Sequence, residues 1–384
     1  MISFNRKTLF SLGIGLLFSA VTLYFTFESI PLKELGAYLR KINYWWIIPS
    51  LLFALLSYAI RVWRWQVILL PVKRAGFMSA FHPLVIGFML NCVMPGRVGE
   101  IARPAIFYKR ENVEFSKVLG TAAMERIIDA ICLLVFFIYI LATITIDDTV
   151  SVTFGRYVLT PATLHKLFMF TLEFSAVLIA LILLISFSKT RKFINRLILR
   201  APDLLFFTTT HARDAIRERI CVKITHFVEN LSVGFDILKS PGYLILVLVQ
   251  SFLLWWLLGV SVWALALGCP GIEITILQAF AVEIIICFAI MLPSVPGYWG
   301  LWEAGGVFGL ALFGIPATEA AGMVLTYHFF HLVPVIIIGL VSAVLIGIKL
   351  TQPVRNGREA LLLEEEEGCR EKNARFTGAG MNKR

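Results

Sequence analysis

The hydrophobic residues of this chain fall into long apolar runs separated by short polar segments. An apolar run of about 20 residues is long enough to cross the hydrocarbon core of a bilayer as a helix. Runs of this kind cover, in order, roughly 8–27, 44–70, 116–146, 163–188, 241–268 and 317–348. The pattern therefore predicts a polytopic membrane protein in which each run forms a transmembrane helix.

Two further apolar regions are interrupted near their middle by proline and glycine. The first breaks at Pro95-Gly96 and the second between Pro293 and Gly297. The arms on either side of the breaks are 78–94 with 99–108, and 274–292 with 299–313. Most arms are short for a full crossing, and proline and glycine stop a helix and let the chain turn. Each region therefore predicts a re-entrant helical hairpin, and a pair of such breaks in matching halves is typical of a transport site.

The two hairpins occupy equivalent places in the two halves of the chain, which indicates an internal duplication. Matching residues recur at a shift of 199 to 202 positions: Val62-Trp63 with Val262-Trp263, Ala80-Phe81 with Ala279-Phe280, Pro95-Gly96 with Pro296-Gly297, and Gly120 with Gly322. Apolar helices also resemble one another through composition alone, so that alternative stays open. We expect an all-α polytopic membrane protein of two inverted repeats, at about 28–146 and 212–348, each with a re-entrant hairpin between two transmembrane helices.

The distribution of positive charge predicts the orientation. The net charge is +10, and Lys and Arg are in excess between Lys189 and Lys239 and in the tail from Lys349. Such excess marks cytoplasmic loops. If both broken regions are hairpins, every strongly basic loop lies on one side except the loop 28–43, so both termini are expected in the cytoplasm. Because the basic residues adjoin spans and form no recognisable reading module, no nucleic-acid partner is expected.

Composition agrees with this interpretation. The chain is 58% hydrophobic and 16% charged, whereas a soluble domain has roughly 25% charged residues. The six cysteines occur singly, so neither a disulfide framework nor a zinc site is indicated, and no cofactor is expected. We expect a membrane domain at 1–348 with a cytoplasmic amphipathic segment at 189–240, followed by a disordered tail at 349–384. Segments 212–238 and 30–42 predict amphipathic helices, which either lie on the bilayer surface or pack on the domain.

Charged residues inside the apolar regions are the candidate site, because an ionisable group at membrane depth is costly unless it pairs, meets water or binds a substrate. Arg97, Glu100 and Arg103 accompany the first break. A guanidinium suits phosphate oxygens, and the nearby carboxylate favours a zwitterionic or phosphorylated head group. The alternative is that these arginines pair with Glu100 or with a carboxylate of the next span.

The next span contains three ionisable residues, Glu125, Arg126 and Asp129. Glu125 and Asp129 are one helical turn apart and so share a face. They are the natural partners of Arg97 and Arg103, either within a substrate site or in purely structural pairs.

The second half offers a matching set of candidates: Pro296, Gly297, Glu303, His328 and His331. Glu303, like Glu283 in the preceding arm, could counter a cationic head group, take up a proton, or lie at the interface. The histidines lack a zinc signature, so we expect polar or proton-responsive lining rather than a metal site. Arg61 and Arg64, beside tryptophans, are expected to anchor their helix at the membrane interface, with a substrate site as the alternative.

Three segments, taken in order, resemble a known family. They are Pro95-Gly-Arg-Val-Gly-Glu-Ile-Ala-Arg103, Glu125-Arg-Ile-Ile-Asp129 and Pro293-Ser-Val-Pro-Gly-Tyr-Trp-Gly-Leu-Trp-Glu303. With Arg61-Val-Trp-Arg-Trp65, they are similar to the transmembrane region of lysylphosphatidylglycerol synthases, which also occurs alone in flippase-like proteins of bacteria and archaea. The resemblance covers roughly 8–348. The third segment departs from the family pattern, because Tyr298 and Trp299 replace a Gly-Leu pair and Trp302 stands where arginine is common.

The resemblance implies movement of phosphate-bearing or aminoacylated lipids between the leaflets of a prokaryotic inner membrane. It does not imply lipid synthesis, because the aminoacyl-transferase domain of the full-length synthases is missing. We therefore expect a flippase or scramblase-like translocase of a phospholipid or polyprenyl phosphate, with Arg97 and Arg103 holding the phosphate. The rival hypotheses are an intramembrane enzyme acting on lipid head groups and an accessory partner of a lipid-modifying enzyme. The chain has no phosphate-binding loop of an ATP motor, and a homo-oligomer is compatible with the sequence.

Overall fold

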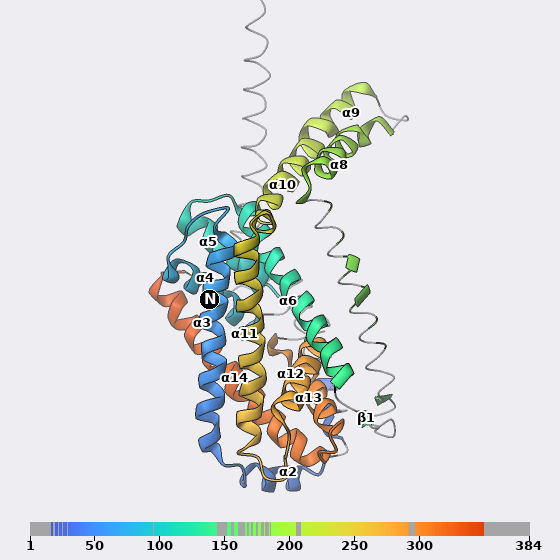
Figure 1. Cartoon of the computed structure of the whole chain (residues 1–384). Helices are drawn as coiled ribbons and strands as arrows, with labels where there is room; N and C mark the ends of the chain where they lie inside the picture. The colour runs from blue at the N-terminus through green and yellow to red at the C-terminus, as the bar shows by residue number, and fades with distance from the viewer. Residues whose placement is uncertain are drawn as a thin grey trace, which may run out of the picture.

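The computed structural model is a bundle of helices (Figure 1). It describes residues 30–94, 96–143, 186–204, 209–291 and 296–348, with scattered positions between 17 and 28 and between 152 and 184. The predicted all-α class is confirmed, and a short antiparallel pair, β1 (Val152–Phe154) and β2 (Tyr157–Leu159), is the one sheet in these residues. The predicted spans 8–27 and 163–188 lie mostly, and the tail 349–384 wholly, outside them.

Four long helices coincide with four of the predicted spans. They are α3 (Ile47–Leu69), α6 (Phe115–Thr143), α11 (Pro241–Ala266) and α14 (Ala317–Leu345). A 3-10 turn, η1 (Tyr44–Trp46), leads into α3. Among the described residues, η1 with α3, α11 and α14 are each long and apolar enough to cross a membrane.

Each half of the chain has a pair of shorter helices between two long ones. The pairs are α4 (Phe77–Val93) with α5 (Gly99–Glu111), and α12 (Ile276–Met291) with α13 (Leu301–Ala311), the latter preceded by the turn η5 (Pro296–Tyr298). Both halves therefore have the same element order. Both α5 and α13, and both α6 and α14, begin 202 positions apart.

The first break folds α5 back against α4. Gly96 and Arg97 adopt left-handed backbone, with φ of 79° and 52°, a conformation that ends a helix and reverses the chain. Asn91 then accepts the backbone N–H of Gly99 at 2.7 Å. A Cβ on Gly99 would lie 1.8 Å from the carbonyl oxygen of Gly87, so the two helices meet at a contact that only glycine permits.

The second break has the same three features as the first: left-handed backbone, a side chain that accepts a backbone N–H, and a close glycine contact. Gly297 and Tyr298 have φ of 71° and 61°, and Gly300 has φ of 90°. The Glu303 carboxylate accepts the Gly300 N–H at 2.7 Å, which caps the first turn of α13. A Cβ on Gly305 would lie 2.8 Å from that of Ala289, so α13 packs tightly on α12.

Helices of the two halves pack across each other. The helices α3 and α11 lie side by side along their length (Figure 1), and the Ser50 and Ser261 hydroxyls meet at 3.1 Å. The first-half α4 packs on α14, where Gly339 meets Met89. The second-half α12 packs on α6, where the Phe137 and Phe288 rings are 5.1 Å apart. Each short pair is therefore held by the last long helix of the other half.

The peripheral helices α2 (Leu32–Leu39) and α10 (Val222–Val233) also pack on a long helix of the other half of the chain. The helix α2 packs on α14, where Gly322 faces the ring of Tyr38. The helix α10 packs on α6, where Gly120 faces the Leu231 carbonyl. Figure 1 shows α2 at one end of the bundle and α10 at the other.

The predicted amphipathic helix 212–238 is interrupted in the structure. It consists of α9 (Thr210–Ile216), a π-helical turn η3 (Arg217–Cys221) and α10, and then ends in the 3-10 turn η4 (Asp236–Lys239). The helix α8 (Ser188–Arg200) and its 3-10 end η2 (Ala201–Leu204) precede it, and α8 packs back on α10. Arg191 donates to the Ser232 hydroxyl at 2.7 Å and Asn195 to the Glu229 carboxylate at 3.0 Å. The segment is therefore a helical hairpin that projects from the bundle (Figure 1).

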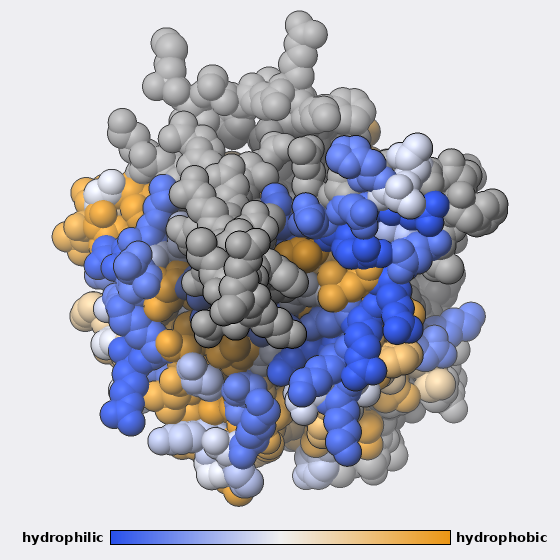
Figure 2. Space-filling model, turned by 90° about the horizontal axis from the view of Figure 1, so that it is seen from above, coloured by the Kyte–Doolittle hydropathy of each residue, from blue (hydrophilic) through white to orange (hydrophobic). Residues whose placement is uncertain are grey.

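Hydrophilic residues gather on the end of the bundle from which this hairpin projects. Figure 2 views that end and shows hydrophilic residues spread over it with hydrophobic residues between them. The loop after α3 is fixed to the end of α5 there, because the Lys73 ammonium lies 2.9 Å from the Glu111 carboxylate. The basic residues Lys109 and Arg110 stand in the last turn of α5, directly before this contact.

Candidate functional site

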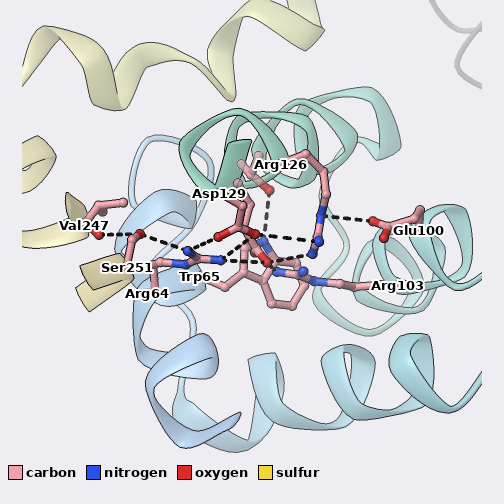
Figure 3. A network of polar contacts seen from close by, with 10 residues as sticks. Arg64, Trp65, Glu100, Arg103, Arg126, Asp129, Val247 and Ser251 are labelled. Carbon is pink, nitrogen blue, oxygen red and sulfur yellow. Dashed lines mark hydrogen bonds and ion pairs between the residues drawn. The ribbon is translucent and has the colours of Figure 1, made fainter. Parts of the chain in front are cut away.

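A buried network of charges joins α3, α5 and α6 (Figure 3). The Arg64 guanidinium donates to both carboxylate oxygens of Asp129, at 2.5 and 3.2 Å, and lies 3.2 Å from the Glu125 carboxylate. Arg103 donates to the other oxygen of Glu125 at 2.6 Å. All four of these side chains are buried, and Arg64 also donates to the Ser251 hydroxyl of α11 at 2.9 Å.

Arg126 extends the network towards the first break. Its guanidinium lies 3.0 Å from the Glu125 carboxylate, 3.4 Å from that of Glu100 and 3.6 Å from that of Asp129. The network thus holds three arginines and three carboxylates, so its formal charges cancel. A buried pair of this kind is costly to break, because the remaining charge loses its partner in a medium that solvates it poorly.

The position of Arg64 corrects one prediction. Arg61 and Arg64 do not anchor α3 at the membrane interface, because they are 9% and 0% exposed. Ser57, Arg61 and Arg64 recur at helical spacing on the buried face of α3, whereas Trp63 points outward at 53% exposure. That polar face, at i, i+4 and i+7 in an apolar helix, is the sequence signal that identifies both arginines as inward-facing.

A cavity of about 350 Å³ lies beside this network. Residues of α3, α4, α5, α6, α11, α12, α13 and α14 and of both breaks line it, so both halves of the chain contribute to it. Its lining combines charged, aromatic and aliphatic side chains; the charged ones are Arg61, Arg97, Glu100, Arg126, Asp129 and Glu283. A mostly apolar cavity with a few convergent polar groups is typical of a ligand-binding site.

Arg61 is a cation of this cavity that pairs with no carboxylate in the described residues. Among the described residues it forms neither an ion pair nor a hydrogen bond, and its guanidinium lies 5.4 Å from the Phe88 ring centre and 5.5 Å from that of Trp255. The indole N–H groups of Trp255 and Trp302, which also line the cavity, find no acceptor in the described part of the chain. The cavity therefore offers uncommitted hydrogen-bond donors and suits a ligand rich in acceptor oxygens.

Arg97 connects the two breaks. Its guanidinium donates to the backbone carbonyl of Ile290, near the end of α12, at 2.5 Å, and lies 6.0 Å from the centre of the Tyr298 ring. The carbonyl takes up only part of its donor capacity, because a guanidinium carries five N–H groups. Arg97 both lines the cavity and holds the second break against the first.

The second half presents a carboxyl and an aromatic wall. Glu283 is 3% exposed, accepts the Tyr327 hydroxyl at 3.2 Å, and is not within ion-pair distance of any cation in the described residues. The His328 ring stacks on Trp302 at 4.7 Å and lies 4.5 Å from the Trp299 ring. Trp299 and Trp302, two of the residues that depart from the family pattern, therefore lie against a histidine.

His328 joins Glu303 to the second break. One ring nitrogen lies 2.6 Å from the Glu303 carboxylate, and the other lies 2.8 Å from the Gly297 carbonyl. A carbonyl only accepts, so the nitrogen facing Gly297 carries a proton. His331 similarly lies between the Tyr327 carbonyl, at 2.9 Å, and the Ser261 hydroxyl, at 3.1 Å.

The structure brings most of the predicted site residues together, but in two layers. Six of them line the cavity: Arg97, Glu100, Arg126, Asp129, and on the opposite wall His328 with His331. Arg103 and Glu125 lie behind the cavity, paired with each other, and Glu303 lies behind His328. Pro296 and Gly297 form the turn of the second break. Sequence reasoning favoured the membrane interface for Arg61 and did not single out Tyr58 or Trp255; all three line the cavity, from α3 and α11.

Residues 12–339 match the family described as the lysylphosphatidylglycerol synthase TM region. The chain belongs to this family. Within it, a UPF0104 membrane protein of Pyrococcus horikoshii is 27% identical over 275 residues, which cover 67% of this chain and 75% of the relative. No solved structure matches the chain. Membership of the lysylphosphatidylglycerol synthase TM-region family and the apolar helices make the chain an integral membrane protein, and the resemblance seen in the sequence is confirmed.

Proposed function

We propose that this family member is a translocase that moves a phosphate-bearing lipid between the two leaflets of its membrane. The observation that carries the proposal is Arg61, a buried arginine that forms no ion pair or hydrogen bond in the described residues, in a cavity whose other two arginines are hydrogen-bonded. A guanidinium binds phosphate through paired, charge-assisted hydrogen bonds. The lipid phosphate would bind Arg61, with Arg97 as the second cation, while the acyl chains remain in the surrounding lipid.

The proposed path relies on an inverted repeat. The shared element order, the constant shift of 202 positions for α5 with α13 and α6 with α14, and the exchanged packing of α4 and α12 support two repeats related by a pseudo-two-fold axis. Figure 1 places α4 and α5 towards one end of the bundle and α12 and α13 towards the other. Under this proposal the two pairs are re-entrant hairpins from opposite faces, and the cavity lies where their breaks meet, as in transporters built from inverted repeats.

Orientation follows from charge. The basic segment 189–240 and the loop with Lys73 lie at the same end of the bundle, near the end of α5. Because basic loops remain in the cytoplasm, we propose that this end faces the cytoplasm of a prokaryotic inner membrane and that both termini lie on that side.

The proposal is tested by reconstituting the purified chain into vesicles that contain fluorescent phosphatidylglycerol, with a fluorescent diacylglycerol of the same chains as the phosphate-free probe. Chemical bleaching of the outer leaflet then reports how fast inner-leaflet probe becomes accessible. We expect the protein to accelerate exchange of phosphatidylglycerol over protein-free vesicles and to leave the diacylglycerol rate unchanged. Equal acceleration of both probes would instead indicate a general bilayer defect.

The same vesicles separate transport from enzymatic action. A translocase returns its lipid chemically unchanged, so chromatography of the extracted probe should show a single species after complete exchange. Conversion of the probe to a new lipid would favour the rival hypothesis of an intramembrane enzyme.

A further inference from the structure

Glu283 shares the cavity with Arg61 but does not pair with it. Both side chains are at least nine-tenths buried, at 3% and 9% exposure, and both line the cavity from opposite halves of the chain. Their charged groups are farther apart than the 4.0 Å of an ion pair. The carboxyl group has a donor on each side, the Tyr327 hydroxyl at 3.2 Å and the Cys287 thiol at 3.9 Å.

Among the described residues around Glu283, no cation makes the direct contact that would hold the carboxylate ionised. The titratable and charged groups that line the same cavity around it are Arg61 and Tyr58 of α3, Cys92 of α4, Arg97 and Tyr298 at the breaks, Glu100 of α5, Arg126 and Asp129 of α6, Cys287 of α12, and Tyr327, His328 and His331 of α14. Arg126 is engaged by three carboxylates of the network. His328 is engaged by Glu303 and the Gly297 carbonyl. Arg61 and Arg97 are therefore the cations of the described residues that face Glu283 without a carboxylate partner, and Arg97 already donates to the Ile290 carbonyl.

A phosphate bound at Arg61 changes this balance. It brings a negative charge close to the Glu283 carboxyl. It also neutralises the positive charge of Arg61, which otherwise favours the ionised form of Glu283. An ionised carboxylate beside a phosphate in a cavity of low polarity is repelled by it, whereas a protonated carboxyl is not and can donate its O–H to a phosphate oxygen. Phosphate binding and proton binding therefore favour each other.

We propose that Glu283 is the proton site of this protein and that the translocase carries a proton together with its phosphate-bearing lipid. The inference rests on the phosphate site of the proposed function and adds its energy source. In the loaded state the carboxyl is protonated and the phosphate is held by Arg61. When the phosphate leaves, the positive charge of Arg61 is no longer neutralised, and Glu283 then releases its proton. Reciprocity requires that lipid affinity rises as pH falls through the titration of Glu283.

The binding arm of the test uses short-chain phosphatidylglycerol and the detergent-solubilised chain. A phosphodiester keeps one negative charge between pH 5.5 and 8.5, so any pH dependence reports the protein. We expect wild-type affinity to fall by about tenfold across this range. Calorimetry in buffers of different ionisation enthalpy should show uptake of up to about one proton per lipid bound. Glu283→Gln, whose amide imitates the protonated carboxyl, should bind with less than about a twofold pH effect and take up no proton.

The transport arm applies a pH gradient to the reconstituted vesicles. Protons that move with the lipid should concentrate phosphatidylglycerol in the leaflet facing the alkaline compartment. The Glu283→Gln variant should show lipid exchange between the leaflets without this bias. Glu273→Gln removes an exposed carboxylate from the loop before α12 and serves as the matched control, which should retain the wild-type bias.

Each outcome is decisive for one of the two proposals. Proton uptake that persists in Glu283→Gln, or that disappears in His331→Gln instead, overturns the assignment of the proton to Glu283. Wild-type binding without proton uptake overturns the coupling itself. Proton-linked binding without any leaflet exchange would leave Glu283 as the proton site and contradict the translocase.

Discussion

The Arg64 guanidinium of α3 donates two hydrogen bonds, of 2.5 and 3.2 Å, to the Asp129 carboxylate of α6, and both side chains are buried. Arg64 also lies 3.2 Å from the Glu125 carboxylate, so it holds two successive turns of α6 against α3. Removing Arg64 leaves both buried carboxylates with fewer cations.

Arg64→Met is therefore expected to lower the free energy of unfolding by about 3–5 kcal/mol, the usual cost of breaking a buried ion pair. Unfolding in detergent, followed by circular dichroism, measures it. Asp236→Asn breaks a surface pair with Lys239 and is the control, with an expected cost below about 1 kcal/mol. Equal costs for the two variants would mean that the network contributes little to stability.

Glycine at position 99 is required by the close approach of α5 to α4. A Cβ there would lie 1.8 Å from the Gly87 carbonyl oxygen and 2.6 Å from the Asn91 side chain. Gly99→Ala should separate the helices of the first hairpin and lower the unfolding temperature. Gly36→Ala, on the exposed face of α2 with nothing within 4 Å, should instead stabilise the protein by about 0.5–1 kcal/mol. A harmless Gly99→Ala would contradict the packing of the hairpin.

Replacing Glu303 by glutamine is expected to preserve the stability of the protein, whereas replacing it by alanine is expected to lower it. In Glu303→Gln the amide oxygen can still accept the Gly300 N–H, and its NH₂ can donate to His328, whose other nitrogen remains protonated towards Gly297. In Glu303→Ala both groups lose a partner, at a cost of about 1–3 kcal/mol each. Thermal unfolding of the two variants distinguishes them. A loss in Glu303→Gln as large as in Glu303→Ala would show that the charge itself is required.

The Lys73–Glu111 pair predicts a small acid sensitivity at the end of α5. The hydrogen bond from Lys73 lowers the pKa of Glu111 in the folded protein. The unfolded chain then binds this proton at a higher pH than the folded chain, so the stabilisation is present above the unfolded pKa, about 4.3, and is lost as pH falls through the lower folded value. Unfolding of wild type and Glu111→Gln between pH 3 and 7 should converge at the acid end, with a difference of up to about 1 kcal/mol above it. A constant difference would contradict this pair.

The hairpin breaks could be predicted from local sequence because their cause is local. Proline and glycine end a helix within one turn, so Pro95-Gly96 and Pro296-Gly297 marked the turns that separate α4 from α5 and α12 from α13. The long helices α3, α6, α11 and α14 followed equally from the length of their apolar runs.

The pairing of charges could not be predicted in the same way. The sequence offered Glu125 of the next span as an alternative partner of Arg103, and the two do pair, but nothing in the sequence indicated that Arg64 pairs with Asp129, 65 positions away. Such contacts depend on which helix faces which, and an arginine near tryptophans on α3 has the composition of an interfacial anchor. The π-turn at Arg217–Cys221 likewise has no local signature that separates it from a continuous amphipathic helix.

The measurement that tests the account most directly is the rate at which reconstituted Arg61→Ala moves phosphatidylglycerol between leaflets, compared with wild type at equal incorporation. Arg61 makes no ion pair in the described residues, so its removal should leave the fold intact, which an unchanged unfolding temperature would verify. Loss of a charged hydrogen bond of about 1.5–3 kcal/mol predicts a rate lower by about ten- to a hundredfold. A folded Arg61→Ala that moves the lipid at the wild-type rate would contradict the phosphate site on which the account rests.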